Sequence, residues 1–308
     1  MKVYNHVRKP EFFIIGAPRC GTTALARYLG EHPDIHLSYP KEPNYFNTDF
    51  SKKQRKFESK TLYLNQCFYK ARENKIAGEA TVWYLYSKDA VPNILEFNPD
   101  ARFIVMLRNP VDLAYAIHSK QISRKVNENI EDFETAWRLQ EKRLQGEHLP
   151  STHRDPKLVQ YKEIAMLGKQ MQRLYSHVDK ERVKVILFDD FKADNKSVYE
   201  DTLKFLGIST DNRQNFPVIN SNSRFRFRWM AKMFSIIGIS TPYVLLLKRK
   251  LGIPEGYSLF RALNKAQVTY EKRKPLNKAF RNELVQTFKD DIVLLQSLID
   301  RDLTHWLK

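Results

Sequence analysis

Apolar and polar residues alternate along this chain in blocks that predict a parallel sheet with helices on its faces. Three apolar runs, at 12–15, 102–107 and 182–188, are short and rich in β-branched residues, as buried strands are. Residues 34–38 and 75–79 are weaker strand candidates. Helical spacing of apolar residues follows in 22–29, 91–97, 111–120, 158–177, 197–206 and 275–307. The pattern therefore predicts an α/β fold with three layers, a central parallel sheet flanked by helices.

Two stretches interrupt this alternation, within what we predict to be a single domain over residues 1–308. Residues 126–156 are polar and contain a glycine and two prolines, which is typical of loops. Residues 221–274 differ from the rest of the chain in both charge and apolar content. We predict that both stretches are insertions or lids over the active site.

Most of the positive charge lies in the second of these stretches. Residues 224–274 contain twelve Lys and Arg residues against two acids, which accounts for ten of the seventeen excess positive charges. Their apolar part, 233–247, is interrupted by a glycine and a proline and is too short to span a bilayer. Two interpretations stay open: a buried helical hairpin that caps the active site, or peripheral membrane contact through 224–250.

Composition and charge narrow the class of protein. Of the 308 residues, 42% are hydrophobic, which supports a sizeable core and excludes a disordered chain. The net charge of +17 implies an anionic partner: a nucleotide, a polyanion, a nucleic acid or a membrane surface. Cys20 and Cys67 are too few for a disulfide framework or a zinc site. With no signal segment at its start, we expect a cytoplasmic protein, although a piece of a longer secretory-pathway protein would give the same pattern.

The first predicted strand runs into a glycine loop, Gly16-Ala17-Pro18-Arg19-Cys20-Gly21-Thr22-Thr23. A strand, a tight loop and a helix bring backbone N–H groups and the positive end of the helix to one point. The two glycines stand five apart, as in the Walker A loop of ATPases and GTPases, but Thr22-Thr23 replaces the usual Lys-Ser/Thr pair. Arg19 supplies the cation instead. We therefore predict an anion site at Arg19, Cys20, Gly21, Thr22 and Thr23, and a fold of the P-loop type.

A second strand delivers another cation to the same edge of the sheet. The run 102–107 ends at Arg108-Asn109-Pro110, and a helix follows. Between the two loops, the stretch Lys41-Glu42-Pro43 follows a short strand, where α/β sheets place active-site groups. Two separate cations suit a ligand with two separate anionic groups, such as a nucleotide with a 5′-linked phosphate and a 3′-phosphate.

These motifs resemble those of the sulfotransferases that use 3′-phosphoadenosine 5′-phosphosulfate (PAPS). The loop 16–25 is similar to the family's 5′-phosphosulfate loop, and 103–120, centred on Arg108, to its 3′-phosphate motif. The resemblance continues through 41–46, 78–81, 183–207 and 298–306, and in style it is closest to bacterial relatives of the heparan sulfate sulfotransferases. Three positions depart from the family, which usually has lysine at Arg19, serine at Ala116 and, in heparan-type enzymes, lysine at Ala80.

The resemblance implies an activity and a set of roles. PAPS would be the sulfuryl donor and 3′-phosphoadenosine 5′-phosphate (PAP) the product, with no metal required. Arg19 would stabilise the 5′-phosphate and take part in catalysis, Arg108 would bind the 3′-phosphate, and the run Lys272, Arg273 and Lys274 would close over the nucleotide. Glu42 would be the general base, with a salt bridge to Lys41 as the competing interpretation. His118 is the second candidate for the base.

The acceptor implied is a glycan or glycolipid, and no nucleic acid partner is expected. Two other classes stay open. A P-loop kinase or NTPase would share the fold and would need an acidic strand end for magnesium, for which Asp189 and Asp190 are the nearest candidates. A non-enzymatic binder of polyanions or membranes would use the basic stretch 224–274 and would show steep salt dependence.

Overall fold

The computed structural model describes residues 8–68, 71, 75–124, 126–219 and 274–308, together with the backbone of 223–225 and 268–270. The chain divides into two compact units, one formed by Met1–Ile219 and Pro275–Lys308 and the other by Asn220–Lys274. In the second unit, β6 (Ser223–Phe225) pairs antiparallel with β7 (Val268–Tyr270). The apolar stretch 233–247 and most of 224–250 lie outside the described residues, so their predicted lid or membrane role stays a prediction.

The first unit contains the parallel sheet that the apolar runs predicted. Its strands have the order β2-β3-β1-β4-β5, and every pair is parallel. The two strongest apolar runs therefore lie side by side in the middle of the sheet, with Phe13 opposite Phe103. The five strands are β1 (Phe12–Gly16), β2 (Ile35–Leu37), β3 (Ile76–Ala80), β4 (Arg102–Leu107) and β5 (Val183–Leu187).

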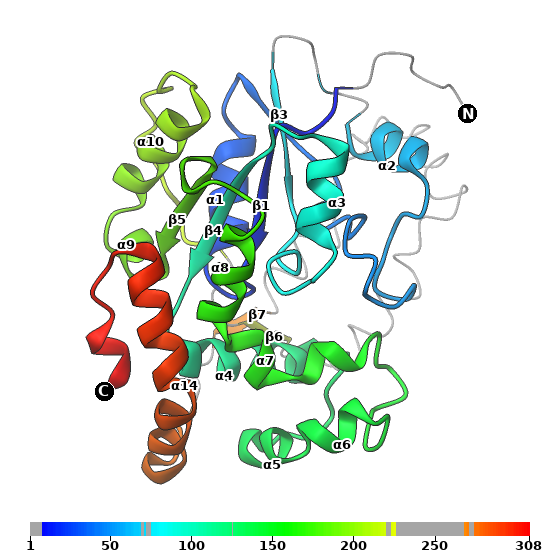
Figure 1. Ribbon diagram of the computed structural model, residues 1–308, viewed down its shortest axis with the longest axis vertical. Coiled ribbons are helices and arrows are strands. Elements are labelled where there is room, and N and C mark those ends of the chain that lie inside the picture. Colours follow the sequence, from blue (N-terminus) through cyan, green and yellow to red (C-terminus); the bar gives the residue numbers. More distant parts are fainter. Residues whose placement is uncertain are drawn as a thin grey trace. The chain divides into compact units, whose positions relative to one another are not determined.

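Helices cover both faces of this sheet, which confirms the predicted three-layer architecture (Figure 1). In Figure 1, α3 and α8 lie in front of the sheet and α1 lies behind it. The helices are α1 (Thr22–Gly30), α2 (Lys60–Cys67), α3 (Ala90–Phe97), α4 (Pro110–Arg124), α5 (Phe133–Arg138), α6 (Gln140–Leu144), α7 (Tyr161–Ala165), α8 (Leu167–Tyr175), α9 (Phe188–Ala193), α10 (Asn195–Leu206) and α14 (Lys278–Ile299). Short 3₁₀ turns lie at Pro156–Val159, Lys180–Arg182 and Thr304–Leu307.

The prediction of a single helix over 158–177 was wrong, because the chain forms two helices there, α7 and α8, with a break at Met166. Met166 has ψ near 70°, outside the helical region. The carboxylate of Asp291, on α14, accepts hydrogen bonds from the N–H groups of Gly168 (2.7 Å) and Lys169 (2.9 Å). These donors belong to the first turn of α8 and would otherwise lack partners. A side chain from a distant helix thus starts α8, which apolar periodicity within 158–177 cannot reveal.

The C-terminal helix is also shorter than the predicted 275–307. It ends at Ile299 because Asp300 adopts a left-handed conformation with φ 52°, and a 3₁₀ turn follows at Thr304–Leu307. Trp306, which is 1% exposed, packs in the core there, and its indole N–H donates to Asp189 at 3.2 Å. This turn returns the end of the chain to the carboxyl edge of β5.

The segment 126–156, predicted as an insertion or lid, contains α5 and α6 and packs on the core of the first unit. Phe133 and Trp137 belong to the main buried cluster. A fully buried ion pair between Arg143 and Glu128 (2.7 Å) adds a polar anchor. Whether the segment closes over a ligand stays a prediction.

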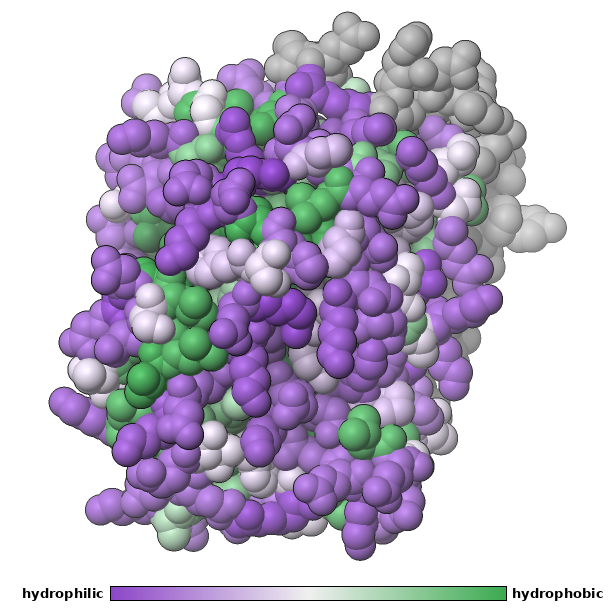
Figure 2. Space-filling model, in the orientation of Figure 1, coloured by the Kyte–Doolittle hydropathy of each residue, from purple (hydrophilic) through white to green (hydrophobic). Residues whose placement is uncertain are grey.

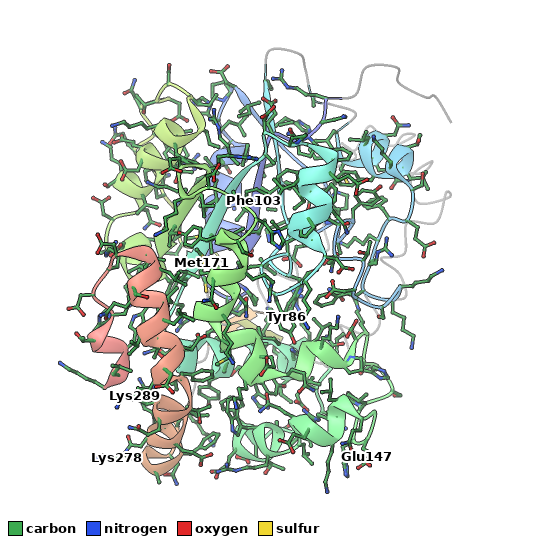
Figure 3. The ribbon with its side chains drawn as sticks, in the orientation of Figure 1. Tyr86, Phe103, Glu147, Met171, Lys278 and Lys289 are labelled. Carbon is green, nitrogen blue, oxygen red and sulfur yellow. The ribbon has the colours of Figure 1, made fainter. Side chains whose placement is uncertain are left out.

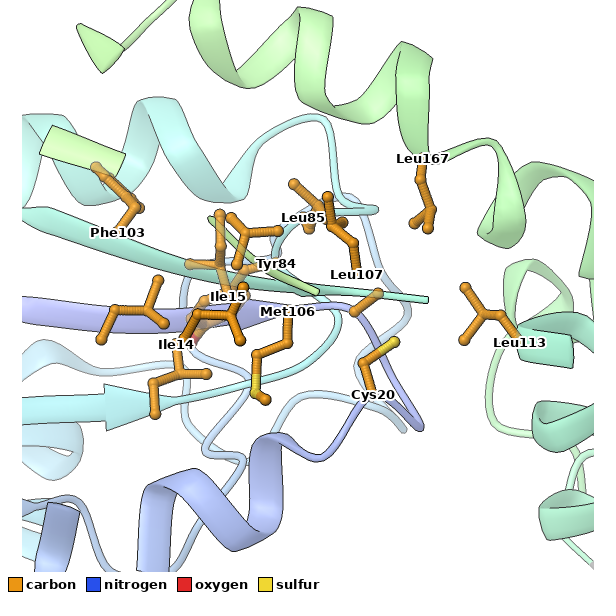
Figure 4. Close-up of a cluster of buried hydrophobic side chains, with 14 of the residues drawn as sticks. Ile14, Ile15, Cys20, Tyr84, Leu85, Phe103, Met106, Leu107, Leu113 and Leu167 are labelled. Carbon is orange, nitrogen blue, oxygen red and sulfur yellow. The ribbon is translucent and has the colours of Figure 1, made fainter. Parts of the chain in front are cut away.

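The core lies between the sheet and its helices. Figure 4 shows Ile14 and Ile15 of β1 beside Met106 and Leu107 of β4. Figure 3 labels Phe103 of the sheet and Met171 of α8 in this interior, whereas Lys278 and Lys289 of α14 are exposed. The described part of the face in Figure 2 is mostly hydrophilic, with small apolar groups between the polar ones. Among the described helices, none has the length and apolar content needed to cross a membrane.

Candidate active site

The glycine loop connects β1 to α1 in a conformation that few other sequences could adopt. A Cβ on Gly16 would lie 2.8 Å from the Cβ of Leu85, and one on Gly21 would lie 3.0 Å from the ring of Phe191. Arg19 and Gly21 both have positive φ, 63° and 89°. The N-cap of α1 is Gly21, which has no side chain to occupy the first N–H groups of the helix. The backbone N–H groups at the start of α1 are therefore not capped by a side chain, and they are suited to binding an anion.

Arg108 lies beside this loop. Its Nη1 donates to the carbonyl oxygen of Arg19 at 3.4 Å, and its guanidinium stacks 4.9 Å from the ring centroid of Phe188. The helix after it starts in an ordered way because the side-chain oxygen of Asn109 accepts the N–H of Val111 at 3.0 Å. The structure thus brings together the two cations that the sequence placed at strand ends, since β1 and β4 are neighbours.

The remaining residues of the predicted 5′-phosphate site occupy the loop and the first turn of α1. Thr22 is buried, and Thr23 is partly exposed. Cys20 is fully buried, and burial raises the pKa of its thiol to about 12, although Arg108 and Arg19 oppose the change. At neutral pH the thiol is therefore protonated, which agrees with a packing role for Cys20 and leaves its N–H to contribute to the loop.

Glu42 lies at the end of β3, in a loop that hydrogen bonds to that strand. Its N–H donates to the carbonyl oxygen of Ala80 at 3.0 Å, and its carboxylate accepts from Nζ of Lys41 at 2.9 Å. Burial raises the pKa of this carboxyl, but Lys41, Lys56 and Arg124 outweigh burial and hold the pKa below its usual range. Glu42 is therefore ionised at neutral pH. The salt bridge to Lys41 that competes with a catalytic role is present.

Helix α4 carries two cations, Lys120 and Arg124. The charge of Lys120 interacts with that of Arg19 in the glycine loop, and the charge of Arg124 interacts with that of Glu42. Burial, together with the charges of Arg124 and Arg19, lowers the pKa of Lys120 to about 8. Arg124 also acts on Glu42. Lys120 and Arg124 are four residues apart and so share a face of the helix. Arg124 was not predicted from the sequence, although its spacing of four residues from Lys120 is a signal that indicates it.

His118 does not join this group. It is 2% exposed, its Nε2 is 2.8 Å from the carbonyl oxygen of Ile130, and its ring packs against Phe133 and Tyr161. Burial lowers its pKa. These contacts favour a packing role, and we do not assign it a catalytic one.

The basic run of the predicted nucleotide lid belongs to the second unit. Lys272 and Arg273 lie outside the described residues, and Lys274 is exposed. Their predicted role stays a prediction.

The two acids considered for magnesium face the end of the chain. Asp190 pairs with Arg301 at 2.9 Å, and Asp189 accepts from Trp306. Within the described ranges, no three His, Cys, Asp or Glu side chains are grouped as metal ligands would be.

A second carboxylate, Glu79, is fully buried at the end of β3. It accepts hydrogen bonds from the hydroxyl groups of Tyr63 and Thr81, the latter at 2.7 Å. Burial raises its pKa to about 7, although these partners and Tyr84 oppose the shift.

This pKa predicts a pH dependence of stability. An unfolded glutamate has a pKa near 4.5, so between that value and about 7 the folded protein holds a proton that the unfolded chain has lost. Its contribution to the free energy of unfolding is therefore full below pH 4.5 and is lost as the pH rises through 7. We expect the wild type to lose roughly 3 kcal/mol relative to Glu79→Gln over this window. Urea unfolding of both proteins at pH 5 and pH 8 measures the difference, and equal pH slopes would contradict the prediction.

Comparison with known proteins gives three findings. Residues 9–232 match the family described as "Sulfotransferase domain". A solved bacterial structure, the sulfotransferase from Alicyclobacillus acidocaldarius, superposes with a TM-score of 0.72 at 25% identity and covers 98% of this chain and 100% of its own. Two curated relatives are similar over shorter stretches.

The first of these relatives is the membrane-associated sulfotransferase kil1 of Dictyostelium discoideum, 34% identical over 107 residues, or 33% of this chain and 21% of the relative. The second is the human heparan sulfate glucosamine 3-O-sulfotransferase 6, 28% identical over 117 residues, or 38% of this chain and 32% of the relative. The matched part thus spans between a fifth and a third of the length of these relatives.

Proposed function

Because this chain belongs to the sulfotransferase domain family, we propose that it transfers the sulfuryl group of PAPS to a hydroxyl or amine of an acceptor. The observation that carries the proposal is that Arg108 lies against the glycine loop at one edge of the sheet. Its Nη1 is 3.4 Å from the carbonyl oxygen of Arg19. Two cations on neighbouring loops and an open helix N-terminus fit a nucleotide that carries separate 5′ and 3′ anionic groups.

The residues of the loop act by holding charge. In sulfuryl transfer, as in phosphoryl transfer, catalysis depends mainly on positioning and on stabilising charge at the leaving oxygen. Arg19 and the N–H groups of residues 20–23 would stabilise the 5′-phosphate as its charge grows, and one such donor is worth ~3 kcal/mol. Arg108 would hold the 3′-phosphate. Arginine at position 19 keeps the charge that the family's lysine supplies and can bind an oxyanion with two N–H groups.

Glu42 is the proposed general base. Its loop is hydrogen bonded to the end of β3, and the charges of α4 reach both it and the glycine loop. The ionised carboxylate can accept the proton of the acceptor hydroxyl or amine. The contact with Lys41 holds the side chain of Glu42 in place before the acceptor binds. During transfer, Glu42 would need to keep this contact with Lys41 while it accepts the proton of the acceptor.

For the acceptor we propose a carbohydrate or glycoconjugate. The support is the similarity to the human relative named for heparan sulfate glucosamine, and the cations Lys41, Lys56 and Arg124 around Glu42. We also propose peripheral membrane contact through 224–250, which the membrane-associated Dictyostelium relative supports. A cytoplasmic location stays a prediction.

A transfer assay tests the proposal. The full chain is incubated with PAPS labelled in the sulfuryl group and, in separate reactions, with unsulfated heparosan oligosaccharides, a neutral glycolipid, a simple phenol or buffer alone. We expect label in the oligosaccharide or the glycolipid, and none with Arg108→Ala. Label in the phenol alone would replace the carbohydrate proposal. The absence of both transfer and PAP release would overturn the proposed activity.

A further inference from the structure

Glu79 is a buried carboxylate to which the proposed transfer assigns no role. It lies opposite Phe13 in the pairing of β3 with β1, and its side chain is 0% exposed. An ionised carboxyl in such a place is costly unless several hydrogen bonds stabilise it. Two hydroxyl groups, on Tyr63 and Thr81, donate hydrogen bonds to it, and the hydroxyl of Tyr84 acts on it as well. Such an arrangement calls for a reason beyond packing.

The direction of the bond from Tyr84 follows from proton counting. The phenol oxygen of Tyr84 accepts the backbone N–H groups of Tyr45 (3.0 Å) and Phe46 (3.3 Å). A phenol has a single proton of its own. With two donors already on its oxygen, Tyr84 has its own proton left to direct toward Glu79 and Thr81, the two side chains that act on its hydroxyl and that are hydrogen bonded to each other at 2.7 Å. The carboxylate thus orients a hydroxyl that holds the loop of Glu42 by two backbone N–H groups.

The same segment is bonded to the strand that leads into the glycine loop. The N–H of Thr81 donates to the carbonyl oxygen of Ile14 at 3.0 Å, and that of Leu85 to the carbonyl oxygen of Ile15 at 2.9 Å. On its other side, the carbonyl oxygen of Ala80 accepts the N–H of Glu42. Residues 79–85 are therefore hydrogen bonded both to the loop of Glu42 and to β1, the strand that leads into the proposed phosphate loop.

We propose that Glu79 is a positioning residue, which acts through Tyr84 to hold the loop of Glu42 in register with the glycine loop. The inference rests on the proposed sulfotransferase function. In-line transfer needs the base and the leaving phosphate at a fixed separation, and a misplacement of ~1 Å can cost about 100-fold in rate. Glutamine at position 79 would place an NH₂ group, which can only donate, opposite hydroxyl groups that also donate. The interaction with Tyr84 would therefore be disturbed.

Two tyrosine variants separate positioning from packing. Tyr84→Phe removes the hydroxyl that joins Glu79 to the loop, and Tyr63→Phe removes a hydroxyl that binds the same carboxylate without contacting the loop N–H groups. Both tyrosines are 0% exposed, and both variants keep their rings. Each variant, together with Glu79→Gln, is measured for hydrogen exchange at the Tyr45 and Phe46 amides, for PAP affinity, and for kcat as PAP release from PAPS with water as acceptor.

For Tyr84→Phe and Glu79→Gln we expect exchange at the two amides to accelerate roughly tenfold or more, because each leaves buried N–H groups without a well-placed acceptor. Their kcat should fall about 10-fold to 100-fold, with PAP affinity within about twofold of wild type. Tyr63→Phe should stay close to wild type in all three measurements. Wild-type exchange and kcat in Tyr84→Phe, or equal losses in Tyr63→Phe, would overturn the proposal.

A failure of the proposed function would look different. If the wild type neither binds PAP nor releases it from PAPS, the sulfotransferase proposal fails. The exchange rates of the Tyr45 and Phe46 amides then still decide whether Glu79 holds this loop.

Discussion

Glu42→Gln is expected to lower kcat by roughly 100-fold to 10,000-fold, the range typical of losing a general base. The amide has nearly the shape of the carboxylate but cannot accept a proton from the acceptor. Lys41, Lys56 and Arg124 hold the pKa of Glu42 low against the opposing effect of burial, so the carboxylate is ionised at neutral pH and free to accept a proton. Since the variant leaves the glycine loop and Arg108 unchanged, its affinity for PAP should stay within about twofold of wild type.

Glu58→Gln is the matched control for this experiment. Glu58 is an exposed glutamate sixteen residues further along, and its contact with Lys52 is a long one of 3.7 Å. It should keep the wild-type kcat. A Glu42→Gln enzyme that turns over at the wild-type rate would remove Glu42 from the mechanism and leave its salt bridge with Lys41 as its role.

Arg108→Ala is expected to weaken PAP binding by roughly 30-fold to 3,000-fold. Losing one partner of a partly buried, hydrogen-bonded charge pair costs about 2–5 kcal/mol, and about 1.4 kcal/mol is tenfold in affinity. The guanidinium is held by the carbonyl oxygen of Arg19 and by the ring of Phe188, so little ordering is needed when the 3′-phosphate binds. Isothermal titration calorimetry measures the change.

Arg102→Ala controls for the loss of positive charge. Arg102 begins the strand that Arg108 follows, is exposed, and donates to the carbonyl oxygen of Phe205 at 3.1 Å, at the opposite end of β4. Its removal should leave PAP affinity unchanged. Equal losses in both variants would mean that overall charge, and not a site at Arg108, attracts the nucleotide.

Much of the fold could be predicted because its signals are local. The strand 102–107 was predicted with the bounds that the structure gives, since a buried parallel strand is a continuous apolar run. The helix predicted over 197–206 ends at Leu206 as expected, because the next residue, Gly207, caps α10 with φ 73°. The contact between Arg108 and Arg19 could also be predicted from local patterns, because each residue follows a strand of the same parallel sheet.

What could not be predicted depends on contacts between residues far apart in the sequence. The division of 158–177 requires Asp291, more than a hundred residues away. The role of Tyr84 depends on the loop of Tyr45 and Phe46 folding onto the end of β3, which no spacing within either segment shows. His118 was the second candidate for the base, but the segment after α4 folds back and covers it through Ile130 and Phe133.

The most direct test of the central claim is a calorimetric titration of the full chain with PAP and, separately, with ATP and magnesium. We expect tight binding of PAP, lost in Arg108→Ala and retained in Arg102→Ala, with no heat from ATP. Binding of ATP without binding of PAP would contradict the sulfotransferase assignment and favour a kinase. If neither nucleotide binds, the meeting of Arg19 and Arg108 is not a nucleotide site.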